Sequence, residues 1–392
     1  MSYATLIWPT VLALAALTTW GCASAGRDWP SGAWQGEPLP EAAVTLGGET
    51  FGAQPDELGP IGGGAGYARI VTGGDWRVSD IRSLLAALEK ARSGQTVFVE
   101  PTAEIDVTDR VFVEEGFSLV VPAGVTLASD RGHEGSPGAM LYSDAFQTRP
   151  LVKAGGAGVR VTGLRLRGPD PKRRLEFHSR VFFEGGGGDK AYYRFPNSDG
   201  VSTVFDDLEV DNCEISGWSH GGVYLTDGSG QRVHHSFLHH NQRMGLGYGI
   251  CVNHDAEALI ACNVLQDNKH HIAGSGMPGS GYEARNNIVL PESEVHLNSA
   301  GKPYGQDHVF DMHGGRDRLD GTEIAGAWLK IHHNTVVSAY LPVNIRGVPQ
   351  RSAEIHHNWF VRATAGQETV VTSGRTTVGP NACGRPPRLE PP

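Results

Sequence analysis

The sequence predicts an all-β protein in which short strands wind into a stacked coil. Three observations predict it: a composition rich in Gly and poor in charge, a repeat of about 24 residues, and one amphipathic segment before the repeats. Gly accounts for 53 of 392 residues, roughly twice its usual share, and charged residues for 19%, against a usual figure of about 25%. Helical bundles are rich in Ala, Leu, Glu and Lys, so this composition favours short strands and tight turns.

The charge balance argues against a nucleic-acid partner. The formal net charge is −10, the sequence pI is about 5.9, and no long basic run is present. A small or polymeric ligand is therefore the expected partner, and we expect the chain to act as a monomer.

The N-terminal segment 1–25 is predicted to be an export signal. It has an apolar stretch over 6–17 and ends on Ala-Ser-Ala at 23–25, a small-x-small cleavage pattern. The alternative is a lipid anchor on Cys22, although the bulky Trp20 stands where a lipobox has a small residue. No later segment approaches about 20 uninterrupted apolar residues, so we expect a secreted or periplasmic protein.

A repeat organises the middle of the chain. Each copy reads apolar, two residues, Asn or a small residue, one residue, apolar, and the copies are spaced by 23, 27, 24, 47 and 24 residues. A weaker copy, Val161 to Leu166, lies 49 residues upstream, which is about two periods. The central positions of the six copies are Cys213, Ser236, Asn263, Asn287, Asn334 and Asn358.

A second short strand follows each copy. Two or three strands in about 24 residues, with no helix between them, fit a coil whose turns pair about 4.8 Å apart. The repeated Asn then has a structural role: it is suited to a left-handed bend, and its amide can pair with the same position one turn away. These strands begin near Val223, Ile250, Ile272, Val309, Val343 and Val370.

The segment before the repeats supplies a cap for the open end of the coil. Ser79-Asp80 precedes apolar residues at helical spacing over 81–91, which predicts an amphipathic helix with an N-cap. Two early strands are expected at 96–99 and 119–127. A helix over the end of a stacked sheet protects an edge that would otherwise aggregate.

These features resemble the right-handed parallel β-helix of the pectin-lyase-like superfamily. The resemblance rests on the capping helix, the stretch Val-Pro-Ala-Gly-Val-Thr-Leu at 121–127, and the turns at 331–336 and 355–360. It covers roughly 75–375 and implies an all-β, single-stranded parallel β-helix with an N-terminal capping helix. The Gly- and Pro-rich flanks, 26–74 and 376–392, are interpreted as a linker and a C-terminal tail. The superfamily includes lyases, hydrolases, epimerases, esterases and phage or adhesin shafts, so fold alone does not name a reaction.

The paired histidines are expected to be structural. Three of the four pairs immediately precede a repeat position, where a turn residue recurs, and none is predicted to ligate a metal. Cysteine spacing also makes a zinc site improbable. The pairs are His234-His235, His239-His240, His332-His333 and His356-His357.

Stacking is expected to gather ionisable side chains from successive second strands on one surface. Equivalent positions in adjacent turns lie within roughly 5–10 Å of one another. The predicted catalytic set is Lys269, His271, His308, Asp311, His313 and Arg346. The predicted substrate-binding set is His220, Tyr248, Asn253, His254, Arg285 and Arg194.

Asp311 is the sharpest oddity in this alignment. It falls in a column of inward apolar residues, so we expect it to be hydrogen-bonded, to coordinate a cation, or to be turned outward by a bulge. Calcium, which members of the resembled family often use, is assigned to Asp311 with Asp255, although no tight acidic cluster is visible. The 47-residue interval is interpreted as one turn whose loops, 291–307 and 314–326, flank the cluster.

The predicted function is degradation of an acidic polysaccharide, by a lyase that uses β-elimination. Such a lyase needs a cation for the sugar carboxylate, a base for the proton beside it, and a proton for the departing oxygen. Arg346 or Arg285 suits the first task, and Lys269, His271 or His308 the second. A glycoside hydrolase of the polygalacturonase type, an epimerase and a non-catalytic binding or adhesive β-helix remain as alternatives.

Overall fold

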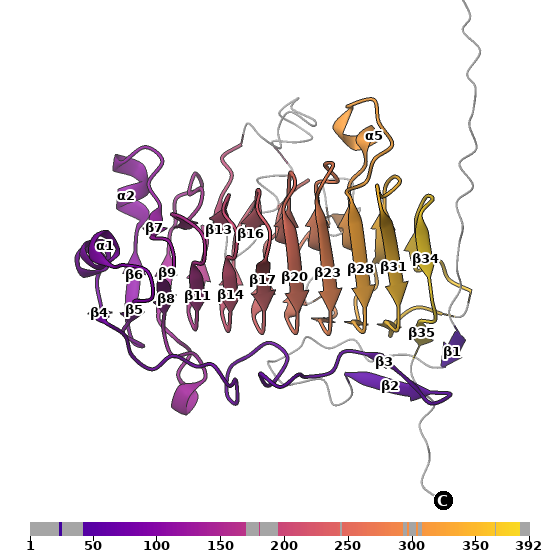
Figure 1. Ribbon diagram of the computed structural model, residues 1–392, viewed down its shortest axis with the longest axis horizontal. Helices are drawn as coiled ribbons and strands as arrows, with labels where there is room; N and C mark the ends of the chain where they lie inside the picture. Colours follow the sequence, from indigo (N-terminus) through magenta and orange to yellow (C-terminus); the bar gives the residue numbers. More distant parts are fainter. Residues whose placement is uncertain are drawn as a thin grey trace, which may run out of the picture.

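The computed structural model shows three long parallel sheets wound into one coil, with a helix at its N-terminal end (Figure 1). Each turn of the coil contributes one strand to each sheet, in the order sheet 1, sheet 2, sheet 3. The described residues are 23–25, 42–169, 180, 195–243, 245–292, 296–297, 303–304, 308–364 and 366–384.

Sheet 1 contains β4 (Trp76–Val78), β5 (Thr96–Val99), β8 (Thr126–Ala128), β11 (Arg160–Thr162), β14 (Glu209–Asp211), β17 (Gln231–His234), β20 (Glu257–Ala261), β23 (Gly281–Arg285), β28 (Trp328–His332), β31 (Ser352–His356) and β34 (Thr376–Val378). Sheet 2 contains β6 (Glu104–Asp106), β9 (Met140–Tyr142), β12 (Arg165–Arg167), β15 (Glu214–Ser216), β18 (Phe237–His239), β21 (Val264–Gln266), β24 (Ile288–Val289), β29 (Thr335–Val336), β32 (Trp359–Phe360), β35 (Ala382–Gly384) and β1 (Ala23–Ala25). Sheet 3 contains β7 (Leu119–Val121), β10 (Val152–Ala154), β13 (Asp199–Thr203), β16 (Gly221–Leu225), β19 (Tyr248–Val252), β22 (His270–Gly274), β27 (His308–Met312), β30 (Leu341–Ile345) and β33 (Val370–Val371).

The remaining elements lie outside the coil's three sheets. Two antiparallel pairs join β2 (Ala43–Leu46) to β3 (Glu49–Gly52) and β25 (His296–Leu297) to β26 (Pro303–Tyr304). The helices are α1 (Ile81–Lys90), α2 (Thr108–Val113), α5 (Gly315–Arg318) and a short 3-10 turn, His133–Gly135. None of the helices in the described part of the chain is long and apolar enough to cross a membrane.

The register confirms the stacked coil and corrects one spacing. The pairing of β23 with β28 shows that the 47-residue interval is a single turn, as predicted. The pairing of β11 with β14 shows that the 49 residues before the first strong copy are also one turn, not two. The extra length lies between the end of β12 at Arg167 and the start of β13 at Asp199.

The Asn ladder is confirmed and extends one turn further than predicted. The side-chain amide of each Asn donates to the Oδ1 of the next at 2.9–3.0 Å, in the order Asn263, Asn287, Asn334, Asn358 and Asn381. The expected left-handed bend lies one residue earlier for the first four members: Cys262, with φ +54°, precedes Asn263, and Asn286, His333 and His357 precede the next three. The ladder amides therefore bridge turns, while their neighbours make the corner.

The histidine pairs occupy these corners. His332 stacks on His356 at 5.1 Å between ring centroids, and His333 stacks on His357 at the same separation. His240 also has a left-handed backbone and precedes Asn241, whose amide donates to Asn268 in a second, shorter ladder. All four pairs thus lie at coil corners, including the pair that the repeat did not explain.

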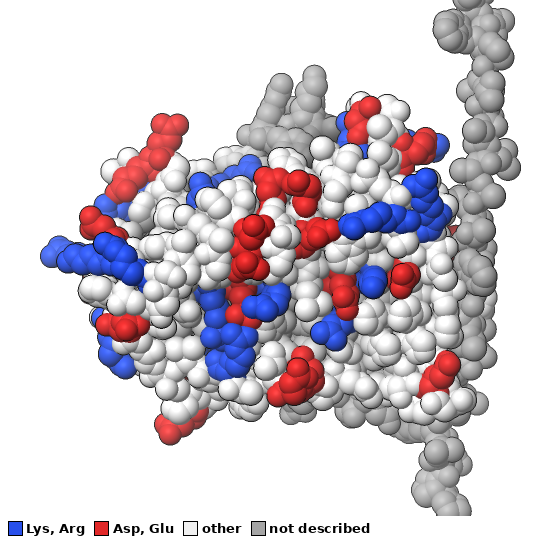
Figure 2. All heavy atoms as spheres, viewed as in Figure 1, with Lys and Arg blue, Asp and Glu red and all other residues white. Residues whose placement is uncertain are grey.

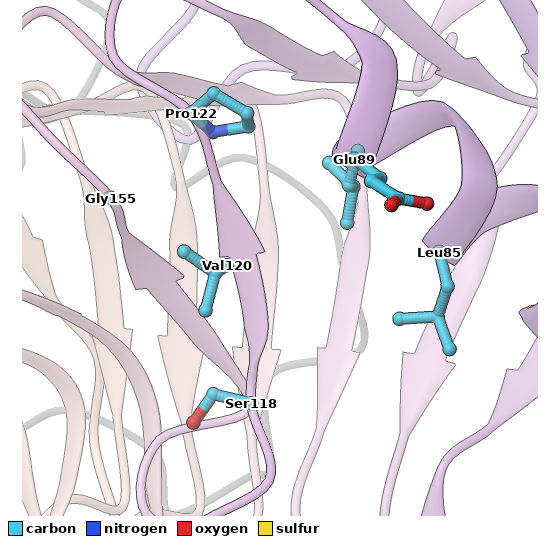
Figure 3. Close-up of a pocket in the computed structure, with 7 residues that line it drawn as sticks. Leu85, Glu89, Ser118, Val120, Pro122 and Gly155 are labelled. Atoms are coloured by element: carbon cyan, nitrogen blue, oxygen red, sulfur yellow. The ribbon is translucent and has the colours of Figure 1, made fainter.

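The predicted capping helix is confirmed as α1. Asp80 is its N-cap and accepts a hydrogen bond from the Ser83 amide at 3.0 Å. Leu84 and Leu88 are buried against the first turns, so the helix covers the end of the core. A shallow pocket of about 430 Å³ lies where Leu85 of α1 faces β7 (Figure 3).

The segments interpreted as linker and tail carry structure. Residues 42–74, here called the strap, run along the side of the coil as the indigo chain in Figure 1. Phe51 and Tyr67 of the strap are buried, and Arg69 binds Glu209 of β14 through two hydrogen bonds. The strap is therefore packed onto the coil, and β34 and β35 extend the coil past residue 375.

Candidate functional site

A groove of about 840 Å³ lies on the outer surface of sheet 3. It crosses β16, β19 and β22 and reaches His313 and Arg346, which follow β27 and β30; the loop carrying α5, drawn in orange in Figure 1, forms one wall. Its polar and aromatic lining includes His220, Tyr224, Tyr248, Asn253, His254, Lys269, His270, His313, Asp317, Arg318 and Arg346. Figure 2 shows a different face of the molecule, which lies over sheet 1. Acidic and basic side chains are interspersed on this face, and it has no comparable hollow.

The register places Asp311 one column away from its predicted position. Phe310, not Val309, pairs with Ile272 of the turn below, so Met312 occupies the inward column that we had assigned to Asp311. Asp311 pairs with Ala273 and points to the outer side of the sheet. Because side chains alternate along a strand, this shift of one residue moves the carboxylate from the core side to the groove side.

Asp311 is the centre of a buried polar cluster beneath the groove. Arg346 Nε donates to its Oδ1 at 2.9 Å, and Arg346 Nη2 donates to its Oδ2 at 2.6 Å. His313 Nε2 lies 3.1 Å from Oδ2, and His308 Nδ1 lies 3.6 Å from Oδ1. Both carboxylate oxygens are thus occupied by side chains from two neighbouring turns.

These contacts decide the charge of the cluster. Burial by itself raises the pKa of Asp311, but His313, His270 and Arg346 together hold this pKa well below its usual range. Burial lowers the pKa of His270 well below its usual value, and nearby Asp311 only partly opposes this effect. The cluster therefore contains an ionised Asp311, a cationic Arg346 and a neutral His270.

His271, a predicted base, points into the core. It is 1% exposed, and its Nδ1 accepts a hydrogen bond from the Asn268 amide at 3.2 Å. Burial lowers the pKa of His271 to about 3. This placement removes His271 from the groups that a substrate can reach, and its neighbour His270 faces the groove instead.

His220 and Asp199 form an oriented pair at the other end of the groove. His220 Nδ1 lies 2.7 Å from Asp199 Oδ1, and Arg149 holds the second oxygen of that carboxylate at 2.9 Å. The His220 ring lies 4.6 Å from the Tyr224 ring and 6.4 Å from the Tyr248 ring. A carboxylate on Nδ1 fixes the imidazole tautomer and leaves Nε2 as the proton acceptor.

Aromatic rings connect this pair to the Asp311 cluster. Tyr248 stacks on His270 at 5.5 Å, and His270 stacks on His308 at 5.1 Å. The Tyr248 phenol also interacts electrostatically with the Arg346 guanidinium. Groups able to carry protons and positive charge therefore follow one another across consecutive turns, along the axis of the coil.

The other predicted residues divide between the groove and distant positions. Lys269, Asn253, His254, Tyr248, His220, His313 and Arg346 all line the groove, as expected from stacking. His308 supports the cluster from beside it, where Asn344 Nδ2 lies 2.9 Å from His308 Nε2. Arg285 ends β23 in sheet 1, 3.4 Å from Glu283, and so lies away from the groove. Arg194 and most of the insertion 169–200 lie outside the described residues, as does most of loop 291–307.

The two carboxylates assigned to calcium are not brought together. Asp255 interacts with Asp227, beyond the end of β19, while both oxygens of Asp311 bind Arg346. A bidentate guanidinium leaves this carboxylate poorly placed for a hard cation, which prefers several free oxygen ligands. The residues present do not fit the predicted calcium site.

Four charged or aromatic groove residues were not predicted: Tyr224, His270, Asp317 and Arg318. His270 was not predicted because side chains do not alternate strictly along β22. His271, the residue before the inward Ile272, is also buried in the core, so His270 is the residue that faces the groove. Asp317 and Arg318 belong to α5, in a loop with no repeat partner. The alternation of Phe310 and Met312 was the available signal for the correct register of β27.

The comparisons with known proteins agree on the fold. No family model and no curated protein sequence matches the chain. The chain is similar to an alginate lyase from Paenibacillus sp. str. FPU-7, with 15% identity, a TM-score of 0.53, and coverage of 79% of this chain and 94% of that one. A Dettilon tailspike protein shows 12% identity, a TM-score of 0.38, and coverage of 81% and 67%.

An exopolygalacturonase of Family 28 from Yersinia enterocolitica is also similar, with 11% identity, a TM-score of 0.33, and coverage of 78% and 76%. At these identities the similarity concerns the fold alone. The similarity to the alginate lyase structure and the three stacked parallel sheets show that the protein is a parallel β-helix, as predicted.

Proposed function

We propose that this protein is a secreted polysaccharide-degrading enzyme, a lyase that cleaves a uronic-acid polymer by β-elimination. The observation that carries the proposal is the groove, in which acid-base groups from consecutive turns line one path. A chain-like ligand lying along the coil axis would meet His220, Tyr248, Lys269 and Arg346 in turn.

The proposed base is His220. Its Nδ1 is held by Asp199 at 2.7 Å, so its Nε2 is the atom that removes the proton next to the sugar carboxylate. The electron pair left on that carbon forms the new double bond and expels the glycosidic oxygen. Asp199 acts as a positioning residue, because it touches the imidazole and not the groove.

Lys269 and Arg346 are the proposed partners of the sugar carboxylate. Arg346 binds Asp311 through Nε and Nη2, and its Nη1 lies 3.4 Å from Asp317, so the Lys269 ammonium and the exposed quarter of the Arg346 side chain supply the positive charge toward the groove. Positive charge at this point stabilises the enolate-like transition state. The Tyr248 phenol, beside both His220 and Arg346, is the proposed proton donor to the departing oxygen.

The distribution of carboxylates favours elimination over hydrolysis. A glycoside hydrolase uses two carboxyl groups, one on each side of the scissile bond. Among the described residues that line the groove, Asp317 is the sole carboxylate, and His313 and Arg346 lie 3.7 Å and 3.4 Å from it.

The test is a screen of uronate polymers with the purified full chain, with and without chelator. A lyase produces an unsaturated uronide that absorbs ultraviolet light, and we expect this absorbance to grow unchanged in the presence of chelator. The His220→Asn variant is the matched control and should be inactive. New reducing ends without ultraviolet absorbance would instead identify a hydrolase. The absence of both products would favour a binding or adhesive role.

A further inference from the structure

A second cluster of reactive side chains lies far from the groove, where the strap crosses the coil. Asp56 of the strap places its Oδ1 3.0 Å from His235 Nε2 and its Oδ2 3.6 Å from Cys262 Sγ. The three ligand atoms lie within 4.8 Å of one another. His235 is fully buried, Cys262 is a buried free thiol, and Asp56 is partly exposed.

The hydrogen bonds around His235 leave the cluster one proton short. His234 Nε2 faces Glu209 Oε1 at 3.1 Å, His234 Nδ1 faces His235 Nδ1 at 3.0 Å, and His235 Nε2 faces Asp56 Oδ1. In each of these three contacts both atoms can accept a hydrogen bond, so the contact is a hydrogen bond only if one of the two atoms carries a proton. The two neutral imidazoles carry one N–H proton each, which leaves the third contact without a proton. That contact therefore needs a further proton or a metal cation.

The missing cation belongs at the Asp56 end. Glu209 is held by Arg69 and accepts the His234 Nε2 proton, which leaves His234 Nδ1 to accept from His235 Nδ1. His235 Nε2 then presents a lone pair toward a carboxylate at 3.0 Å, with a thiol beside it. A third proton or a metal ion can occupy this position, and the thiol beside it favours the metal.

Other histidine corners lack this arrangement. The outer Nε2 of His240 lies 3.7 Å from Asp267, and that of His357 lies 3.8 Å from Glu49. Within the described ranges, Asp56, His235 and Cys262 form the one ligand group of this kind that contains a thiol.

We propose that Asp56, His235 and Cys262 bind a divalent transition-metal ion such as Zn²⁺, which fastens the strap to the coil. Sulfur, imidazole and carboxylate ligands suit Zn²⁺, and a tetrahedron with its usual bond lengths separates ligand atoms by about 3.2–3.8 Å. The 3.0 Å and 3.6 Å contacts are near this range. Water reaches the fourth position from the exposed side of Asp56.

The surroundings have the organisation that metal-binding histidines require. His235 donates its second ring N–H to His234, which donates in turn to Glu209, and such outer contacts orient a ligand. The Leu58 amide donates to Asp56 Oδ1 at 2.8 Å and fixes the carboxylate. Burial raises the pKa of the Cys262 thiol to about 12, so the metal displaces its proton to solvent on binding.

Cobalt substitution tests the proposal. The untagged full chain is stripped with chelator, dialysed and titrated with Co²⁺. We expect one equivalent to bind, with the intense near-ultraviolet band of a cobalt–thiolate bond and the visible bands of tetrahedral Co²⁺. Zn²⁺ should remove both bands by competition, and it should raise the melting temperature of the stripped protein.

Two variants and one control separate the site from general thiol binding. Cys262→Ser should lose the thiolate band, Asp56→Ala should bind Co²⁺ more weakly and lose the Zn²⁺-dependent rise in melting temperature, and Cys251→Ser should behave as wild type. Asp56→Ala changes only a strap residue, so it serves if Cys262→Ser fails to fold. Absence of the thiolate band in the wild type, or its persistence in Cys262→Ser, would overturn the proposal.

Discussion

Asp311 and Arg346, from neighbouring turns of the coil, form a two-point ion pair at 2.9 and 2.6 Å beneath the groove. Asp311 is fully buried, whereas Arg346 keeps a quarter of its side chain exposed. The pair thus fixes a guanidinium at the groove surface from below. The ion pair forms because Asp311, on the outer side of β27, lies next to the residue that directly follows β30 in the neighbouring turn.

Asp311→Asn should destabilise the protein by about 3 kcal/mol, because it leaves the guanidinium of Arg346 without its buried counter-charge. The amide also turns a donor toward other donors. Urea unfolding at neutral pH measures the change. Asp317→Asn is the control, since this partly exposed partner of Arg346 should contribute less than about 1 kcal/mol; equal effects of both variants would contradict the central role of Asp311.

His220→Asn should lower kcat by about 10² to 10⁴, the range attributed to a general base, with little change in melting temperature. Asp199→Asn should keep measurable activity but lower kcat with little change in KM, because the amide can turn its NH2 group toward Nδ1 and so no longer selects one tautomer and orientation of the imidazole. His254→Asn, at the exposed rim, should change KM more than kcat. A kcat of Asp199→Asn equal to that of the wild type would exclude the proposed positioning role.

Asn334→Ala should lower the free energy of unfolding by at least about 2 kcal/mol, because the ladder loses partners above and below. Asn334 donates to Asn358 at 2.9 Å and accepts from Asn287 at 2.9 Å. Lys330→Ala, at an exposed position on adjacent β28, provides the comparison. Similar stability of the two variants would mean that the ladder is not a major stabilising element.

Lowering the pH from about 6.5 to 3 should destabilise the folded state partly through His271. Its pKa is about 3 in the fold and about 6.5 when unfolded, so in this window the unfolded chain binds a proton that the folded chain does not. His271→Gln, which can still accept from Asn268, should reduce the slope of unfolding free energy against pH. If the wild type and His271→Gln had the same slope over this pH window, His271 would have to be protonated in the folded protein as well.

The repeated features of the fold could be predicted because each turn of the coil packs against its neighbours in the same way. The ladder from Asn263 to Asn358 recurs at the interval of one turn, and Asp80 and the apolar face of α1 follow local helix rules. The strap could not be recognised in this way. Its contacts, such as Tyr67 with Asp211, join residues 144 positions apart and have no periodic signal.

The site was predicted where stacking determines it and missed where register or loops determine it. His313 and Arg346 reach one groove because they follow equivalent ends of the neighbouring strands β27 and β30, and Lys269 reaches it from the residue just before β22. His271 and Asp311 were misassigned because consecutive inward residues interrupt the simple alternation along sheet 3. The α5 loop, which supplies Asp317, has no counterpart in other turns from which its position could be inferred.

Cleavage of a uronate polymer in water labelled with oxygen-18, followed by mass spectrometry, tests the proposed reaction most directly. β-Elimination breaks the glycosidic bond without adding water, so the wild-type protein should release unlabelled, unsaturated fragments, and His220→Asn should release none. Saturated fragments that carry the heavy oxygen would establish hydrolysis and contradict the assignment of this groove to a lyase, whereas label in unsaturated fragments would only reflect exchange of their reducing ends with water.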